Sequence, residues 1–479
     1  MTIAALALLL VAALIALRDW RAGMVAAIFV GFLADPIRKL LPGEPVVMVV
    51  AVGLVFGIAT LAFLTRHGLA PIRNLALLRA ASRPLELFVL WAVIAGLSTL
   101  VRHQSPAMAG IGLMSYMAPI PALVLAYYFG RDLRLARRWI LCYIALCVAM
   151  HAGTYLDFLG VEWAVLEQVG EGLVIYDLGG ILNAHVGFFR SPEVAAWHAA
   201  TASCLLAILL LGRWIRIPYW MGGLVIAFLL GAGLLTGRRK IFAVVFLFVC
   251  ILAFLLLRYR KGTGQLVSLA LLVGGIAVFG LSEMKEPTRS GAQLSPYVER
   301  TKTVFEDAPE RLRALGLGSI SWGLRANGPL GGGAGVASQG AQHFGGGRGG
   351  AGEGGLGKIA AELGLPGLIL TLWMGYALAR HVRLVLARAG RTPAHSVVVL
   401  GLFSLLAANV PAFVVASQVF GDLFVLLVLG LLFGFMLAIA DSAARQGTAP
   451  AQPQPSPSTP RLHAAREPRP AHLAARSGP

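Results

Sequence analysis

Long apolar runs separated by short polar segments make up most of this chain. The runs lie at residues 3–17, 22–34, 45–64, 85–101, 106–129, 138–159, 194–212, 217–235, 241–257, 264–281, 356–379, 396–412 and 416–440. A helix that crosses a bilayer needs about 20 mostly apolar residues, and most of these runs approach that length. The pattern predicts an all-α, polytopic integral membrane protein with about 13 transmembrane helices, in a range of roughly 12 to 14 because the first two runs are short.

Basic residues fall in alternate loops of this predicted arrangement. They cluster at residues 66–83, 131–138, 213–216, 258–261 and 380–391. Short cytoplasmic loops of membrane proteins are enriched in Lys and Arg, and one topology makes all of these clusters cytoplasmic. We therefore expect a multi-pass membrane protein whose loops 160–193 and 282–355 lie on the opposite, outer face of the membrane.

The runs and loops divide the chain into four parts. Residues 1–281 hold the first ten predicted helices, including the outer loop 160–193, and residues 356–440 hold the last three. Between them lies the large outer loop 282–355. The first half of this loop has helical spacing over 296–326, which predicts one or two amphipathic helices packed over the membrane surface. The second half is rich in glycine. Such a segment is either a mobile flap or a backbone that approaches a ligand closely. The tail 441–479 is rich in Pro, Ala and Arg and is expected to be disordered in the cytoplasm.

Composition excludes a soluble protein. Only 13% of the residues are charged and 58% are hydrophobic, with a mean hydropathy of +0.78, whereas soluble domains carry about 25% charged residues. The net charge of +18 is explained by the basic cytoplasmic loops, so we expect no nucleic-acid partner. The cysteines and histidines have no metal-ligand spacing, and no nucleotide-binding motif is present, so we expect no metal and no cofactor; His151, His185, His198 and His343 are assigned structural or solvated roles.

One short turn is an exception to the enrichment of basic residues in the predicted cytoplasmic loops. Thr236-Gly237-Arg238-Arg239-Lys240 lies on the predicted outer face. Its cations are suited either to bidentate binding of phosphate or to anchoring at anionic headgroups, and their position on the outer face favours the first. Arg190 is a second outward cation, directly before Ser191-Pro192-Glu193, where Pro192 and Glu193 suit the first turn of a helix.

Two carboxylates, Glu353 and Glu362, could each have either a structural or a chemical role. Glu353 directly precedes the helix predicted to start near Leu356. Composition alone favours a helix cap there, and a general base for a substrate in the outer leaflet is the alternative. Glu362 lies inside a predicted spanning helix, within Ala360–Gly367, where we favour a packing notch in which Glu362 bonds to a neighbouring helix.

Together these motifs resemble the O-antigen ligase and O-antigen polymerase (Wzy-type) superfamily. The resemblance covers roughly residues 45–440, with specific motifs in 185–240 and 325–367. The family's Thr-x-Ser-Arg-like turn aligns its arginine with Arg239 and puts Arg238 in the Ser position. Its Pro-Asn-like helix opening matches Ser191-Pro192-Glu193, and its Pro-Leu-Gly-x-Gly stretch matches Gly328–Gly333.

The family's ligases also carry a His-Asn pair before a Gly-x-x-Gly stretch. Gly364-Leu365-Pro366-Gly367 matches the second part, which puts Glu353-Gly354 in the His-Asn position. A rival register uses His343, but the first register also reproduces the residues around the glycines and is preferred. The chain thus has Glu353 where ligases have histidine, which favours polymerase over ligase.

The resemblance implies a metal-independent glycosyltransferase of the bacterial inner membrane that uses an undecaprenyl-diphosphate-linked glycan as its donor. It implies that the active site faces the periplasm and that the outer loops 160–193 and 282–355 are periplasmic. It implies diphosphate binding by Arg239, Arg238, Lys240 and Arg190, with Glu353 as the catalytic base. We expect polymerisation of repeat units for an O-antigen or exopolysaccharide; transfer to lipid A core, as in lipopolysaccharide ligation, is the alternative. The expected partners are the donor, an acceptor glycan, membrane lipids, a chain-length regulator and a flippase. A transporter of lipid-linked sugar or another anion is the competing class, disfavoured because most of the predicted helices are uninterrupted and the polar groups gather on one face.

Overall fold

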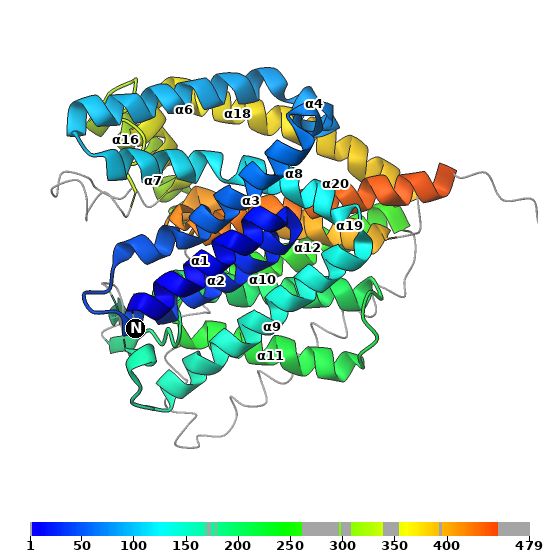
Figure 1. Ribbon diagram of the computed structural model, residues 1–479, viewed down its shortest axis with the longest axis horizontal. Helices are drawn as coiled ribbons and strands as arrows, with labels where there is room; N and C mark the ends of the chain where they lie inside the picture. The colour runs from blue at the N-terminus through cyan, green and yellow to red at the C-terminus, as the bar shows by residue number, and fades with distance from the viewer. Residues whose placement is uncertain are drawn as a thin grey trace, which may run out of the picture.

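The computed structural model describes residues 2–167, 169, 174–177, 180–260, 297, 308–338, 354–391 and 395–448. The described part is almost entirely helical (Figure 1). Its α-helices are α1 (Thr2–Arg18), α2 (Trp20–Leu40), α3 (Ala51–His67), α4 (Ala70–Asn74), α5 (Ala76–Ala80), α6 (Ser82–His103), α7 (Pro106–Met117), α8 (Pro119–Gly130), α9 (Leu133–Phe158), α10 (Pro192–Leu211), α11 (Tyr219–Leu235), α12 (Lys240–Arg260), α15 (Ala308–Arg311), α16 (Ser319–Asn327), α18 (Gly355–Arg391), α19 (Ser396–Val415) and α20 (Leu423–Thr448).

Four short helical turns and one hairpin complete the described structure. The turns are η1 (Val46–Val50), η2 (Ala164–Leu166), the π-helical η3 (Leu312–Gly318) and η4 (Val419–Gly421). The strands β1 (Val174–Asp177) and β2 (Gly180–Asn183) pair antiparallel, with Val174 opposite Asn183.

Within the described residues, nine helices are long and apolar enough to cross a membrane. They are α2, α3 with the end of η1, α6, α9, α10, α12, α18, α19 and α20. The apolar helices α1 and α11 are shorter. These helices confirm the class of an all-α, multi-pass membrane protein. The count of 13 stays a prediction, because the run 264–281 lies outside the described residues.

The run at 106–129 was predicted to be one helix and is two. Helices α7 and α8 meet at Ala118 with a bend of 40°. Pro119 and Pro121 follow the junction, and proline both lacks the N–H that a continuous helix needs and disfavours helical geometry in the residue before it. The bend therefore follows from the sequence Ala118-Pro119-Ile120-Pro121.

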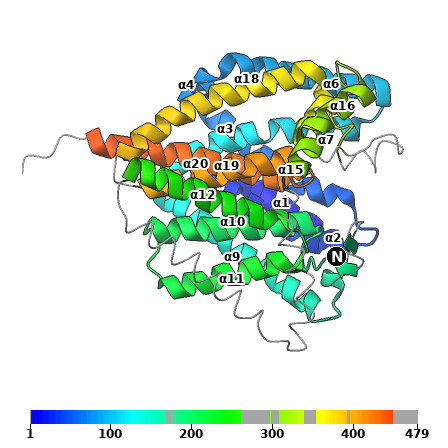
Figure 2. The same cartoon turned by 180° about the vertical axis from the view of Figure 1, so that it is seen from behind.

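Helix α10 forms the centre of the bundle. It lies between α9 and α12 in both views (Figures 1 and 2) and is buried along almost its whole length. Small residues let neighbouring helices approach closely, and alanines occupy many α10 positions. A cluster of rings from α2, α9, α10 and α20 packs beside it, with Phe32 contacting Tyr143, His198 and Phe424.

The bundle has two chemically different ends. At the end that we call the site end, α2, α9, α11 and α19 finish and α10, α12, α18 and α20 begin (left in Figure 1). The opposite end, the basic end, gathers the arginine clusters from separate loops. Contacts between loops join them there: Tyr128 bonds to Pro71 O, and Trp214 bonds to His395. The clusters thus share one end as predicted, and which membrane face that end meets stays a prediction.

Most of the described part of the glycine-rich stretch is buried. Residues 328–338, which we call the glycine insertion, run among α6, α7 and α18, and Gly331–Ser338 have almost no exposed surface. A Cβ on Gly112 of α7 would overlap the backbone of Gly335, so the two segments meet backbone to backbone. For these residues the predicted mobile flap is wrong, because the backbone groups bond to neighbouring helices instead of to water. Residues 339–353 lie outside the described part.

The preceding segment is helical where it is described. Residues Ala308–Asn327 form α15, η3 and α16, as the helical spacing over 296–326 predicted. Helix α16 packs on the start of α18, where a Cβ on Gly323 would meet Gly357 O at 2.7 Å. This contact holds α16 at the site end.

Candidate functional site

Arg190 lies at the site end between two carboxylates from distant segments. Its guanidinium forms ion pairs with Asp35 of α2, at 3.3 Å, and with Asp422 directly before α20. Its backbone N–H also donates to Asp35 Oδ2 at 3.1 Å. Burial alone would lower the pKa of Arg190, but the charges of Asp422 and Asp35 outweigh it and raise that pKa. Arg190 is therefore charged, and carboxylates balance its positive charge within what we call the Arg190 cluster (Arg190, Asp35 and Asp422).

Asp422 explains a difference from the predicted helix limits. The apolar run at 416–440 was predicted to be one helix, but α20 begins only at Leu423. Asp422 accepts a hydrogen bond from Val425 N–H at 2.9 Å and so caps α20. The cap and the ion pair to Arg190 together fix Asp422 between α20 and the start of α10.

The turn before Arg190 is fastened by two further charged side chains. Lys39 of α2 donates to Gly187 O at 2.6 Å. Asp157 of α9 accepts hydrogen bonds from Val186 N–H and Gly187 N–H, at 3.0 and 3.1 Å. Gly187 has φ +57° and lies directly on the backbone of Thr154, so a side chain there would be both strained and obstructed. Residues 185–190 are thus held rigidly against α2 and α9.

Asp157 also forms a pair with His185. Its Oδ1 lies 3.1 Å from His185 Nδ1, and both side chains keep a small exposed fraction, 14% and 17%. The backbone N–H of His185 donates to Leu235 O at 3.1 Å, at the end of α11. A carboxylate on Nδ1 selects the tautomer in which Nε2 accepts a proton, which is the geometry of a general base.

Sequence reasoning missed this pair. His185 was assigned a structural or solvated role because the histidines have no metal-ligand spacing in the sequence. Asp157 precedes it by 28 positions and closes the apolar run of α9. The one available signal was that His185 lies in the predicted outer loop 160–193 and Asp157 lies just before it, so both belong to the same face.

The Thr236–Lys240 turn reaches the same end and is joined to the start of α10. Arg238 Nη2 lies 3.0 Å from Glu193 Oε1, in the first turn of α10. Ser191 Oγ donates to the other oxygen of Glu193 at 2.9 Å. Thr236 Oγ1 accepts a bond from Arg238 N–H at 3.2 Å, which fixes the backbone of the turn. Two segments predicted to matter separately are therefore one local structure.

The other predicted cations complete this turn. Arg239 and Lys240 are half-buried, and Lys240 is the first residue of α12. The predicted diphosphate-binding residues Arg190, Arg238, Arg239 and Lys240 are thus all at the site end. Arg190 and Arg238 have carboxylate partners there, which the sequence did not reveal.

Glu353, the predicted base, lies outside the described residues, as does His343. The next residue, Gly354, packs directly against Leu315 O and Ser319. Gly355 packs on Phe413, whose ring contacts Phe420 at 5.5 Å, two residues before Asp422. The start of α18 therefore lies at the same end of the bundle as the Arg190 cluster.

Glu362 has the structural role favoured by the sequence. It is fully buried and accepts a hydrogen bond from Tyr116 of α7 at 2.7 Å. Its second oxygen accepts Ala337 N–H of the glycine insertion at 3.2 Å. The side chain thus ties α18 to α7 and to the insertion, as expected for a carboxylate at a packing notch.

The site end brings together a turn with consecutive cations, a carboxylate–histidine pair and a charge-balanced arginine. No group of three or more His, Cys, Asp or Glu side chains in the described part is arranged to hold a metal. Fixed cations can stabilise negative charge that develops on a leaving group, and the histidine can accept a proton.

The chain matches no model of a known protein family, and a search of curated proteins finds no match either.

Proposed function

We propose that this protein is an inner-membrane glycosyltransferase that polymerises undecaprenyl-diphosphate-linked repeat units at the periplasmic face, for a surface polysaccharide such as O-antigen or exopolysaccharide. The observation that supports it best is the ion pair between Arg238 and Glu193, which joins the turn 236–240 to the turn 185–193. These are the segments that carry the first set of motifs of the resemblance. Their union puts several cations and a base at one end of the bundle.

In this proposal the cations bind the carrier diphosphate. Arg239 makes a bidentate contact to phosphate oxygens, and Lys240 adds a second positive charge. Arg238 is oriented by Glu193 and supports the same anion. Arg190, predicted to bind the diphosphate as well, has its charge balanced by Asp35 and Asp422, so its proposed role is to hold the turn in place.

The reaction breaks the bond between the anomeric carbon of the donor sugar and the diphosphate oxygen. An acceptor hydroxyl oxygen forms the new bond to that carbon, and the diphosphate leaves with the electron pair. The hydroxyl proton passes to a base. Fixed cations lower the barrier because negative charge develops on the diphosphate as it leaves.

Two residues qualify as that base. Glu353 occupies the family's histidine position in the preferred register. His185, oriented by Asp157, has the geometry of a base among the described residues. Substitution of each, described below, distinguishes them.

The ligase alternative uses the same donor chemistry with lipid A core as the acceptor. Nothing at the site end depends on which acceptor is used. The glutamate at position 353, in place of the ligase histidine, is the feature that favours polymerase.

A transporter is the second candidate, and one observation now favours it more than the sequence did. Helix α18 is broken at Gly364, which has φ +65°, and α7 and α8 are bent, so the expected uninterrupted helices are wrong at these points. Broken helices are typical of transporters, where freed backbone groups bind the cargo. Here the carbonyls of Ala361, Glu362 and Leu363 instead accept bonds from Gly332, Gly333 and Trp91, at 2.8, 3.1 and 2.8 Å. The break is filled by protein, and we keep the glycosyltransferase as the proposal.

The test is reconstitution of the full chain in vesicles with a short undecaprenyl-diphosphate-linked oligosaccharide. Products are separated by length after extraction. A ladder of longer lipid-linked glycans supports a polymerase, and glycan attached to added lipid A core supports a ligase. Passage of the intact donor across the bilayer without any new glycosidic bond would contradict the proposal and support a transporter.

A further inference from the structure

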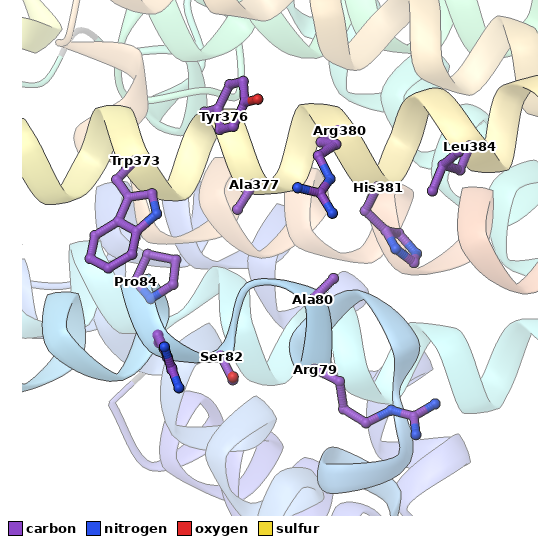
Figure 3. Close-up of a pocket in the computed structure, with 11 residues that line it drawn as sticks. Arg79, Ala80, Ser82, Pro84, Trp373, Tyr376, Ala377, Arg380, His381 and Leu384 are labelled. Atoms are coloured by element: carbon purple, nitrogen blue, oxygen red, sulfur yellow. The ribbon is translucent and has the colours of Figure 1, made fainter.

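A cavity of about 380 Å³ lies at the basic end, away from the proposed catalytic site. It is formed between the elbow 79–84, where α5 passes into α6, and one face of α18 (Figure 3). Arg380 extends from α18 towards the elbow, with His381 beside it. The volume of the cavity is within the range of about 300–1,000 Å³ that is typical of small-molecule sites.

The α18 wall of the cavity is a single helical stripe. Its residues recur every three or four positions, at 373, 376, 377, 380, 381 and 384. This spacing places them on one face, over a length of about 16 Å. The stripe passes from aromatic residues, Trp373 and Tyr376, to basic residues, Arg380 and His381.

The lining of the cavity is positively charged. Arg79, Arg83 and Arg380 all line it, and in the described part of the chain none of the three forms an ion pair with a carboxylate. Arg190 and Arg238 differ, since each has acidic partners. Three arginines in the lining make the cavity positively charged, which suits an anion with several oxygens, such as a phosphate group.

The surroundings of the cavity are suited to a lipid. Towards the middle of α18 the stripe is continued by exposed apolar side chains, with Leu372 64% and Ile369 56% exposed. Trp and Tyr are enriched at the membrane–water interface, and Trp373 and Tyr376 lie between these apolar residues and Arg380. The order along α18 is therefore apolar, aromatic, basic, which matches the order of acyl chain, glycerol region and phosphate in a phospholipid.

We infer that this cavity binds the phosphate headgroup of an anionic phospholipid, with the acyl chains along the exposed face of α18. Basic pockets between transmembrane helices bind anionic headgroups in this way. The bound lipid bridges α6 and α18. It therefore stabilises the folded protein by an amount that increases with the logarithm of its concentration once that concentration exceeds the dissociation constant.

The test uses purified, delipidated full-length protein in a neutral detergent. Phosphatidylglycerol is added, and the melting temperature is measured beside that with phosphatidylcholine and with inorganic phosphate. The variant R79Q/R83Q/R380Q is compared with the control R134Q/R137Q/R138Q, which removes the same charge from exposed positions on α9 at the same end. Native mass spectrometry counts bound lipids in parallel.

We expect phosphatidylglycerol to raise the melting temperature of the wild type and of the control, and to have little effect on the cavity variant. Equal shifts in both triple variants would show a general charge effect and overturn the inference. An equal shift from inorganic phosphate would show a site for free anions and would overturn the lipid assignment.

If the variant R79Q/R83Q/R380Q cannot be purified, the single variant R380Q tests the inference. It should need about tenfold more phosphatidylglycerol for a half-maximal shift, since one bidentate contact is lost. An unchanged lipid requirement in R380Q would contradict the inference.

Discussion

The Arg190 cluster and the glycine insertion both join segments that are far apart in the sequence, but they do so by opposite means. The cluster uses charged side chains from α2, the start of α10 and the residue before α20. The insertion uses backbone amides, with Gly332 and Gly333 bonded to carbonyls at the break in α18. One region is sensitive to charge, and the other is sensitive to the addition of a single methyl group.

The two regions also differ in their proposed roles: one belongs to the reaction site, and the other holds the helices together. Charged and titratable groups gather around Arg190, His185 and Arg238, where the proposed reaction takes place. The insertion bonds through Ala337 N–H to the buried Glu362 of α18, and its other contacts involve mostly backbone. Changes near Arg238 and His185 should therefore affect turnover, and changes in the insertion should affect folding.

The largest expected effect is on turnover at the proposed base. If His185 is the base, His185→Gln should lower the rate of polymer formation by ~10²–10⁴-fold with unchanged protein accumulation, because Gln cannot accept the proton. Glu353→Gln should have that effect instead if Glu353 is the base. Reconstituted protein gives the rates. Asp157→Asn separates positioning from chemistry, since it should shift the pH profile. Normal rates in both His185→Gln and Glu353→Gln would remove both residues from the mechanism.

The next effect is on stability at the Arg190 cluster. Arg190→Met leaves Asp35 and Asp422 buried without a counter-charge and should cost about 3–5 kcal/mol in the free energy of unfolding. Thermal unfolding in detergent measures this cost. Arg216→Met, at an exposed position of the basic end, is the control and should change little. The triple change Arg190→Met/Asp35→Asn/Asp422→Asn should recover much of the loss, and a triple variant no more stable than Arg190→Met would refute the charge argument.

A smaller loss is expected at the glycine insertion. Gly112→Ala places a methyl group on the backbone of Gly335, and such overpacking costs about 1–3 kcal/mol. Gly110→Ala, two residues earlier on α7, meets open space and is the matched control. The melting temperature should fall in Gly112→Ala alone. Equal melting temperatures would show that the insertion is not packed against α7 as described.

The smallest effect on stability is expected at Glu193. Its pair with Arg238 is partly exposed, with side-chain exposures of 19% and 23%, and such pairs contribute about 0.2–1 kcal/mol. Glu193→Gln should therefore leave the melting temperature almost unchanged while it slows polymer formation through a misplaced Arg238. A loss of stability as large as that of Arg190→Met would mean that the two ion pairs do not differ as proposed.

The sequence predicted the helices well because membrane spans are long and apolar. It also placed Arg190 and the 236–240 turn on one face, since charge alternates between loops. It did not reveal Asp35, Asp157 or Asp422, because each lies at the edge of an apolar run and gains its partner only through the fold. The glycine insertion was missed for a different reason: glycine has no hydrophobic periodicity, so a stretch that packs by its backbone resembles an unstructured one.

The central claim is that the Thr236–Lys240 turn binds the diphosphate of a lipid-linked glycan. Arg239→Ala tests it most directly, with polymer measured by gel and protein measured in the same membranes, and with Arg216→Ala as the control at the basic end. We predict that Arg239→Ala forms no polymer at normal protein levels and that Arg239→Lys restores little, because Lys cannot make the bidentate contact. Normal polymer from Arg239→Ala would contradict the account.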